Sequence, residues 1–115
     1  MKIVDTNISI EELKKMSEKM FGGIVKAVVD VEKQIIAVDA DLHADLEQLL
    51  LEEQESKQEN LWGINFHPEN KGSEQFIEFD SMINLRPSWG NKSRGVDDPK
   101  MQKKIRIIVN KLVTP

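Results

Sequence analysis

The residues best suited to chemistry lie in one polar loop between positions 86 and 94. They are Arg86, Trp89, Asn91, Lys92, Ser93 and Arg94. Arginine can bind phosphate or carboxylate through paired donors, and glycines at 90 and 95 let successive backbone amides point at one anion. The spacing of these glycines matches neither a Walker loop nor a dinucleotide-binding loop. Asp97 and Asp98 follow and count against an anion at the next helix start.

The same loop has a purely structural interpretation. Its proline and glycines then only make turns, while Arg86 pairs with Asp80 or Glu78. Trp89 can stack on a base, as tryptophans do in single-strand nucleic-acid sites. A tryptophan in such a loop more often folds back over the core, and packing is the favoured expectation for Trp89.

A second polar group lies on two predicted strands. In an antiparallel hairpin, His67, Glu78 and Asp80 share a face with Asn65 and Arg86. His67 is then a candidate base, with Glu78 or Asp80 as the carboxylate that orients it. No serine or threonine is placed as an obvious nucleophile beside them. A small hydrolase is therefore an alternative function, although the sequence leans away from an enzyme.

A third group follows one face of a predicted helix. Asp39, His43 and Glu47 are each four residues apart, which places them one helical turn from each other. Two carboxylates and one imidazole form a weak metal signature, because zinc sites on helices usually contain a second histidine. A solvated helix face is the favoured interpretation, and no metal or cofactor is predicted.

Composition indicates an ordinary globular protein. The chain has 115 residues, of which 39% are hydrophobic, so residues 1–115 are expected to form a single domain. The absence of cysteine excludes disulfides, thiolate metal sites and cysteine nucleophiles. No secretory leader and no apolar run of about 20 residues is present, so we expect a cytoplasmic protein without a membrane partner.

Charge is distributed unevenly along the chain. Residues 1–85 carry 8 Lys and Arg against 18 Asp and Glu, a net charge of −10, whereas residues 86–115 carry 8 against 2, a net charge of +6. This asymmetry favours an anionic partner for the basic end, or a match between opposite patches within one chain or between copies. A basic last helix can also serve solubility alone.

Periodicity predicts the elements that position these residues. We expect a helix over about 10–20, strands over 24–31 and 35–38, a helix over 39–55, strands over 61–67 and 76–86, and a helix from 99 onward. Ser9 and Glu12 form a capping box for the first helix. The prediction is an α+β single domain of the order helix-hairpin-helix-hairpin-helix. Its four-stranded, mainly antiparallel sheet has helices on one face. Ile3 and Val4 are left open between an edge strand and a tail.

Most of the chain also resembles a known family. It contains the runs VDADLHADLEQLLLEE, LWGINFHPE and FIEFDSMINLRPSWGNKSRGVDDP, followed by a helix of the KIRIIV type. From about Val38 to the last helix, these runs resemble a family of small prokaryotic proteins of unknown function. The resemblance implies no activity, ligand or catalytic residue, and it argues against a well-understood enzyme class.

The preferred function is a binding or regulatory module. Its 86–94 loop and basic C-terminal helix would engage an anionic partner, such as RNA, a nucleotide or an acidic protein surface. The small hydrolase is one alternative. The other is a homo-oligomeric interaction protein, in which the acidic surface of one copy meets the basic end of another.

Overall fold

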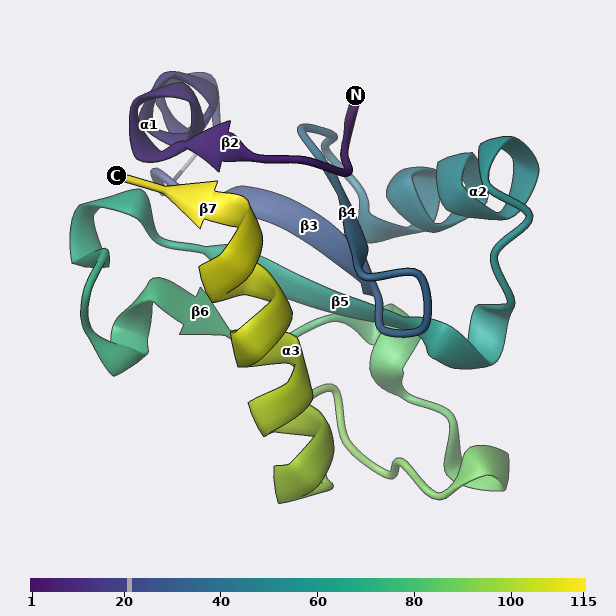
Figure 1. The fold of residues 1–115 in the computed structure, drawn as a ribbon. Helices are drawn as coiled ribbons and strands as arrows, with labels where there is room; N and C mark the ends of the chain where they lie inside the picture. The colour runs from purple at the N-terminus through teal and green to yellow at the C-terminus, as the bar shows by residue number, and fades with distance from the viewer. Residues whose placement is uncertain (21) are drawn as a thin grey trace.

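The computed structural model describes residues 1–20 and 22–115, and an antiparallel sheet lies at its centre. The sheet has five strands in the order β1 (Lys2–Val4), β4 (Ile35–Val38), β3 (Val25–Asp30), β5 (Leu61–Phe66) and β6 (Ile77–Glu78). Three helices surround it: α1 (Ile10–Glu18), α2 (His43–Glu53) and α3 (Pro99–Leu112) (Figure 1). The α+β class is confirmed, but the predicted count of four strands is wrong because the N-terminal segment forms the edge strand β1.

A short parallel pair ties the two ends of the chain together. β2 (Ile8–Ser9) pairs with β7 (Val113–Thr114), which follows α3 directly. Since β2 leads directly into α1, this pair joins the start of α1 to the end of α3 (Figure 1). Neither of these strands was predicted from the sequence.

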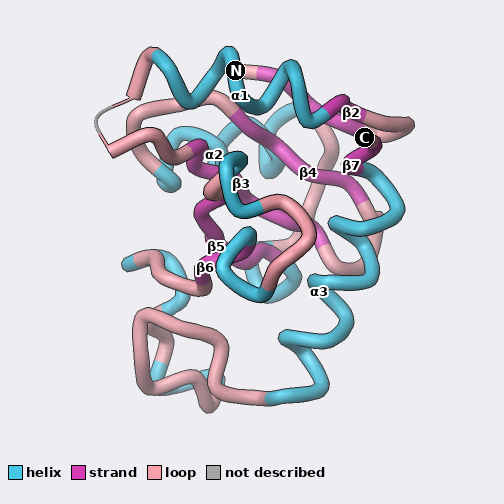
Figure 2. Tube along the Cα trace, turned by 90° about the vertical axis from the view of Figure 1, so that its left-hand side faces the viewer, coloured by secondary structure: helices cyan, strands magenta, loops and turns pink. Residues whose placement is uncertain are grey.

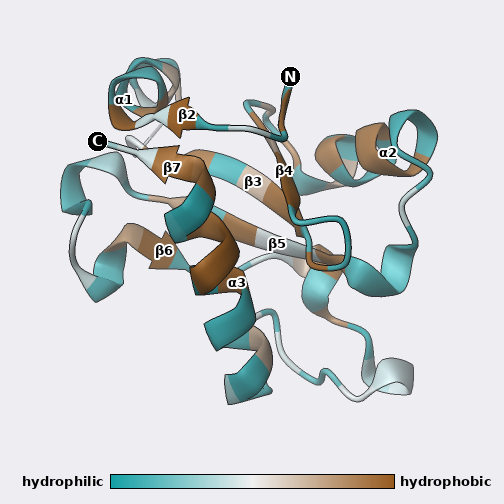
Figure 3. Ribbon diagram, in the orientation of Figure 1, coloured by the Kyte–Doolittle hydropathy of each residue, from teal (hydrophilic) through white to brown (hydrophobic). Residues whose placement is uncertain are grey.

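The sheet buries both of its faces. Val25, Ala27 and Val29 of β3 belong to one core with α1 and α3, whereas Val28 belongs to a second core with Leu46 and Leu50 of α2. Figure 2 shows α2 and α3 on opposite sides of the strands, and Figure 3 shows hydrophobic residues concentrated in the strands. The predicted packing of all helices on one face is therefore wrong. On the face of β3 that α2 covers, Val28 alternates with the polar residues Lys26 and Asp30. This apolar residue was the sign of a second core.

The first hairpin forms as predicted, with β3 and β4 paired antiparallel. The buried carboxylate of Asp30 closes its turn, because Oδ1 accepts hydrogen bonds from the backbone amides of Glu32 and Lys33, both at 2.9 Å. Its Oδ2 accepts a third, from the Ser56 hydroxyl at 2.6 Å. These bonds replace the Asn-Gly or Asp-Gly turn that a short hairpin usually uses.

The second hairpin forms only in part, so the predicted helix-hairpin-helix-hairpin-helix order is not realised in full. The returning strand expected over 76–86 is reduced to Ile77–Glu78, and short 3-10 turns follow it at Met82–Asn84 and Pro87–Trp89. The side chain of Asn84 takes the place of the missing strand beside Gly63 of β5. Its Oδ1 accepts from the Gly63 amide at 2.8 Å, and its Nδ2 donates to the Gly63 carbonyl at 2.9 Å.

The helix boundaries follow from their caps. The Ser9 hydroxyl accepts from the Glu12 amide at 3.1 Å, as the predicted cap requires. α2 begins later than the predicted residue 39, because Asp39 has a left-handed φ of 74° that cannot continue a helix. Asp98 caps α3 and Pro99 occupies its first turn, as expected. In the described ranges no helix is long and apolar enough to cross a membrane.

Candidate functional site

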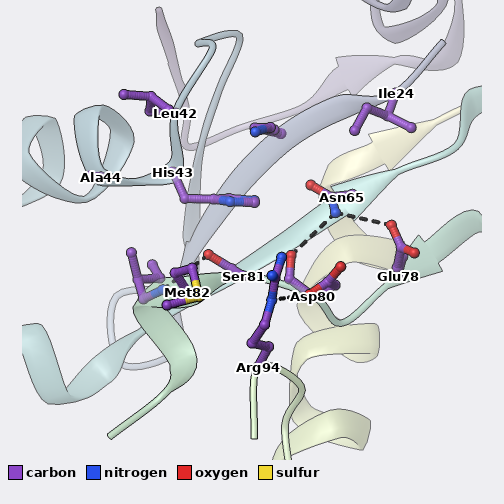
Figure 4. A pocket seen from close by; sticks show the side chains of 12 residues that line it. Ile24, Leu42, His43, Ala44, Asn65, Glu78, Asp80, Ser81, Met82 and Arg94 are labelled. Atoms are coloured by element: carbon purple, nitrogen blue, oxygen red, sulfur yellow. Dashed lines mark hydrogen bonds and ion pairs between the residues drawn. The ribbon is translucent and has the colours of Figure 1, made fainter. Parts of the chain in front are cut away.

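A cavity of about 410 Å³ opens where the N-terminus of α2 meets strands β3, β5 and β6 (Figure 4). We call it the polar cavity. Its polar lining residues come from five parts of the chain and are Lys26, His43, Asn65, Glu78, Asp80, Ser81 and Arg94. The apolar part of its wall is formed by Ile24, Leu42, Ala44, Met82 and Ile83.

Asn65 is fixed in the wall of the polar cavity by its amide nitrogen. Nδ2 donates to Glu78 Oε1 at 3.0 Å and to the Asp80 carbonyl at 3.2 Å, so the orientation of the amide follows from its partners. The residue is only 6% exposed, and its buried Oδ1 accepts no hydrogen bond within the described part of the chain. An unpaired buried acceptor costs about 1–3 kcal/mol. Such an atom at a cavity wall is evidence for a donor supplied from the cavity.

His43 presents a neutral ring to the same cavity (Figure 4). Its Nε2 lies 2.8 Å from the Ile64 carbonyl oxygen, which only accepts, so Nε2 carries the proton. Burial lowers the pKa of His43, and the charge of Lys26 lowers it further, although the hydrogen bond to the Ile64 carbonyl and the nearby polar side chain of Asn65 act in the opposite direction. The ring is therefore neutral at pH 7, with a lone pair left on Nδ1.

Positive charge reaches the polar cavity from three sources. Arg94 donates from Nε to Asp80 Oδ1 at 2.8 Å, and both side chains are about half exposed. Lys26 has no ion-pair partner within the described residues. The N-terminus of α2 is the third source, because the first amides of a helix carry the positive end of its dipole. The N-cap residue of α2 is Leu42, and no described side chain accepts a hydrogen bond from these amides.

The predicted acid/base group is brought together only in part. His67 Nε2 lies 3.2 Å from Glu78 Oε1, at 30% and 47% side-chain exposure. The pKa of Glu78 is lowered, first by the hydrogen bond from Asn65 and then by His67. Asp80 instead turns to Arg94. Glu78 thus links His67 to the wall of the polar cavity.

Arg86 lies away from that group and holds the loop to β5. Its guanidinium donates to the Gln58 carbonyl at 2.7 Å and to the Leu61 carbonyl. It lies 4.3 Å from the centre of the Trp62 ring and 5.5 Å from that of Trp89. The alternative expectation, a pair between Arg86 and Asp80 or Glu78, is wrong, because Arg94 is the partner of Asp80.

Asn91 is a structural residue of the same loop. It is 5% exposed, and its Nδ2 donates to the carbonyls of Asn84 and Gly95, both at 2.8 Å, and to that of Ser93 at 3.1 Å. Its Oδ1 accepts from the Asp97 amide at 2.8 Å. With every polar atom of its amide engaged, Asn91 shapes the loop and is not free to bind a ligand.

The remaining loop residues face solvent. Ser93 donates its hydroxyl to Asp97, which also accepts the Lys92 amide at 2.6 Å, and these bonds hold the pKa of Asp97 below its usual value. The side chain of Lys92 is exposed. Trp89 is 55% exposed, so the favoured expectation that it folds over the core is wrong. Of the six predicted loop residues, Arg94 alone lines the polar cavity.

The three metal candidates do not converge. Asp39 precedes α2 and pairs with Lys19 at 3.3 Å, and His43 is bound to the Ile64 carbonyl. Glu47 lies beside Arg86, whose charge acts on its carboxyl group. Across residues 1–20 and 22–115, no cluster of three or more His, Cys, Asp and Glu residues is placed to hold a metal ion.

Lys26 and the start of α2 are the parts of the site that sequence reasoning missed. Lys26 is a single basic residue in the apolar run IVKAVV, which reads as a solvated position on a strand. Its side chain meets α2 only because the helix covers that face of β3. The sequence signal was therefore limited to one charge inside an apolar strand.

Comparison with known proteins identifies a family. Residues 2–112 match the family model described as "Protein of unknown function (DUF5674)". The chain belongs to this family. Membership in DUF5674 confirms the resemblance to a family of unknown function and assigns no activity to the polar cavity. No curated protein and no solved structure matches the chain.

Proposed function

We propose that this DUF5674 protein is a small binding module that holds an anionic small molecule in the polar cavity. The observation that carries the proposal is Asn65 Oδ1, a buried acceptor that no described residue pairs. It lies at a cavity to which an uncapped helix N-terminus and the cations Lys26 and Arg94 also contribute. An unmet acceptor and cationic groups at the same cavity together favour a ligand over an empty surface hollow.

The two kinds of charge around the cavity specify the ligand further. The amides at the start of α2, with Lys26 and Arg94, suit a carboxylate or phosphate group. Asn65 Oδ1 and the Glu78 carboxylate suit hydroxyl or amino donors. The proposed ligand therefore combines one anionic group with at least one donor, as hydroxy acids, amino acids and phosphorylated sugars do.

This proposal keeps the anionic ligand expected from the sequence and changes its place. Arg94 is common to both versions. Arg86 and Asn91 donate to backbone carbonyls inside the protein, and neither lines the polar cavity. The basic surface of α3 is a separate feature on the opposite side of the sheet.

Titration with inorganic phosphate, followed by amide NMR shifts at low and high salt, tests the proposal. We expect the shifts to concentrate at the start of α2 and at residues 65 and 94, and the affinity to fall with salt. Lys26→Gln and Arg94→Gln should each weaken binding roughly three- to tenfold, the effect of about 1 kcal/mol. Lys104→Gln, which removes an exposed charge on α3, is the matched control.

Two results would refute the proposal. One is an affinity that is unchanged by both cavity substitutions. The other is an equal loss in the Lys104→Gln control, which would show that phosphate follows the net charge of the protein and not this cavity.

A second candidate function is a small hydrolase, favoured by the 3.2 Å contact between His67 and Glu78. A carboxylate that orients an imidazole is the arrangement of a general base. The test is turnover of p-nitrophenyl phosphate and p-nitrophenyl acetate across a pH series. Activity that depends on this pair should be lost in His67→Ala and weakened in Glu78→Gln, and turnover that persists in His67→Ala excludes the mechanism.

A further inference from the structure

A second cavity, of about 450 Å³, adjoins the polar cavity. We call it the tryptophan cavity because Trp89 forms part of its wall. Met82 and Ile83 line both cavities, so the two cavities meet at these side chains. His43 lines the polar cavity and Glu47 lines the tryptophan cavity. The two residues are one turn apart on α2, a rise of about 6 Å along the helix axis. One small molecule can therefore reach from one cavity into the other.

The tryptophan cavity has an apolar wall that the protein leaves open to solvent. Met82 is 61% exposed, Trp89 is 55% exposed and Leu85 is 42% exposed. Large apolar side chains gathered in this way at a concave surface are typical of a binding site. The indole of Trp89 also provides a flat surface of the kind on which an aromatic ring stacks.

The same cavity contains a buried acceptor and a buried donor without partners. Neither Oε2 of Glu47 nor Nε of Arg86 is hydrogen-bonded to any described residue. Burial raises the pKa of Glu47, whereas a hydrogen bond from Gln58 and the charge of Arg86 favour its ionised form. An acyl chain would leave both atoms unpaired, at a cost. A flat ring whose edge carries a donor beside an acceptor would satisfy them.

We propose that the two cavities together bind a nucleotide, with the phosphate in the polar cavity and the base in the tryptophan cavity. The inference rests on the proposed anion site and adds the class of the ligand. The base stacks on Trp89 and presents an N–H to Glu47 and an acceptor to Arg86. The sugar crosses Met82 and Ile83, and its hydroxyls lie on the side of Asn65 and Glu78.

Calorimetric titration of the full chain with inorganic phosphate, adenosine and guanosine, and their 5′-monophosphates tests this inference. We expect at least one monophosphate to bind about fivefold or more tightly than phosphate, since stacking on an aromatic side chain contributes at least that factor. Trp89→Ala should remove this gain and leave the affinity for phosphate unchanged. Glu47→Gln is the second variant, and it should weaken the monophosphate about fivefold or more without affecting phosphate.

Ile107→Ala is the matched control, because Ile107 is an equally exposed apolar residue, at 59%, on α3. It should bind all five probes as the unchanged protein does. If phosphate binds and no monophosphate binds more tightly, or if the gain survives Trp89→Ala, the nucleotide inference is overturned and the anion site stands. If neither phosphate nor any monophosphate binds, the proposed function itself fails, and the inference with it.

Discussion

Replacing Asn84 by alanine tests the idea that one side chain substitutes for a missing strand. Asn84 is fully buried, and its amide makes three hydrogen bonds to the backbone. Two join it to the amide and carbonyl of Gly63, at 2.8 and 2.9 Å. The third, at 3.0 Å, is to the carbonyl of Arg94. This residue therefore joins β5 to the segment that carries Asp80 and Arg94 to the polar cavity.

The size of the effect follows from the groups that Asn84→Ala leaves behind. The N–H and the carbonyl of Gly63 lose their partner in the interior, whereas the Arg94 carbonyl keeps its hydrogen bond from the Ser81 amide at 2.9 Å. Each unpaired buried group costs about 1–3 kcal/mol. Water entering the space left by the amide will pair some of them. We therefore expect a loss of about 3–5 kcal/mol, a large part of the roughly 5–15 kcal/mol that stabilises a typical domain.

Urea unfolding followed by circular dichroism measures this loss. With a slope of about 2 kcal/mol per molar urea, the midpoint should fall by roughly 2 M. Asn110→Ala is the control, because Asn110 is exposed on α3 and its replacement should change stability by no more than about 0.5 kcal/mol. A loss below about 1 kcal/mol in Asn84→Ala would show that the segment after β6 is held by its apolar contacts alone.

Three further outcomes can be checked by the same method. A Cβ on Gly63 would lie 2.5 Å from Ser81 Cβ and Oγ, so Gly63→Ala should cost at least about 1–3 kcal/mol, and Ser81→Gly in the same chain should restore part of it. Arg86→Lys should cost about 2 kcal/mol, since lysine cannot reach both carbonyls while stacked between the two indoles. Because the pKa of His43 is lowered in the folded protein, stability that is present above its usual value of 6.5 should be lost as the pH falls below it, and His43→Gln should reduce this loss. A pH dependence unchanged by His43→Gln would assign it to other groups.

The elements that could be predicted from sequence are those with local signals. The first hairpin, α1 with its Ser9 cap, and α3 with Asp98 and Pro99 at its start are all defined by residues close together in the chain. Periodicity also identified β5. These elements make up most of the sheet and its helices, which is why the α+β class followed from the sequence.

The strand expected from residue 79 onward could not be excluded from the sequence, because the backbone groups of this segment pair with one another and with the side chains of Asn84 and Asn91. The alternation of Ile77, Phe79 and Ser81 is typical of a strand. Asn84 and Asn91, however, bind the backbone groups that a strand would have paired. A buried asparagine and an exposed one look alike in a single sequence, so the alternation predicted a strand that the structure replaces with turns.

The candidate site, like the fold, was predictable where local patterns define it and not where it depends on tertiary packing. The expected convergence of His67, Asn65 and Glu78 needed only strand register, and the structure has all three in hydrogen-bond contact. Lys26 and the N-terminus of α2 could not be assigned to the site from the sequence, because they meet only through the packing of α2 on β3. Arg94 was identified by its charge and its loop, but the structural interpretation paired Arg86, one of three cations in that short stretch, with Asp80 or Glu78, whereas the structure pairs Asp80 with Arg94.

The uneven charge of the chain is neutralised very little within the protein. Among the described residues, Arg94 with Asp80 is the only ion pair that joins the basic last 30 residues to the acidic first 85. The exposed lysines of α3, at 100, 103, 104 and 111, have no such pair. An internal match of opposite patches is therefore a poor explanation for the asymmetry. These lysines remain a basic surface on α3, on the opposite side of the sheet from the polar cavity. Because α3 lies across the sheet from the polar cavity, neutralising two of its lysines should leave the association rate of phosphate unchanged, whereas Lys26→Gln should lower that rate at low salt.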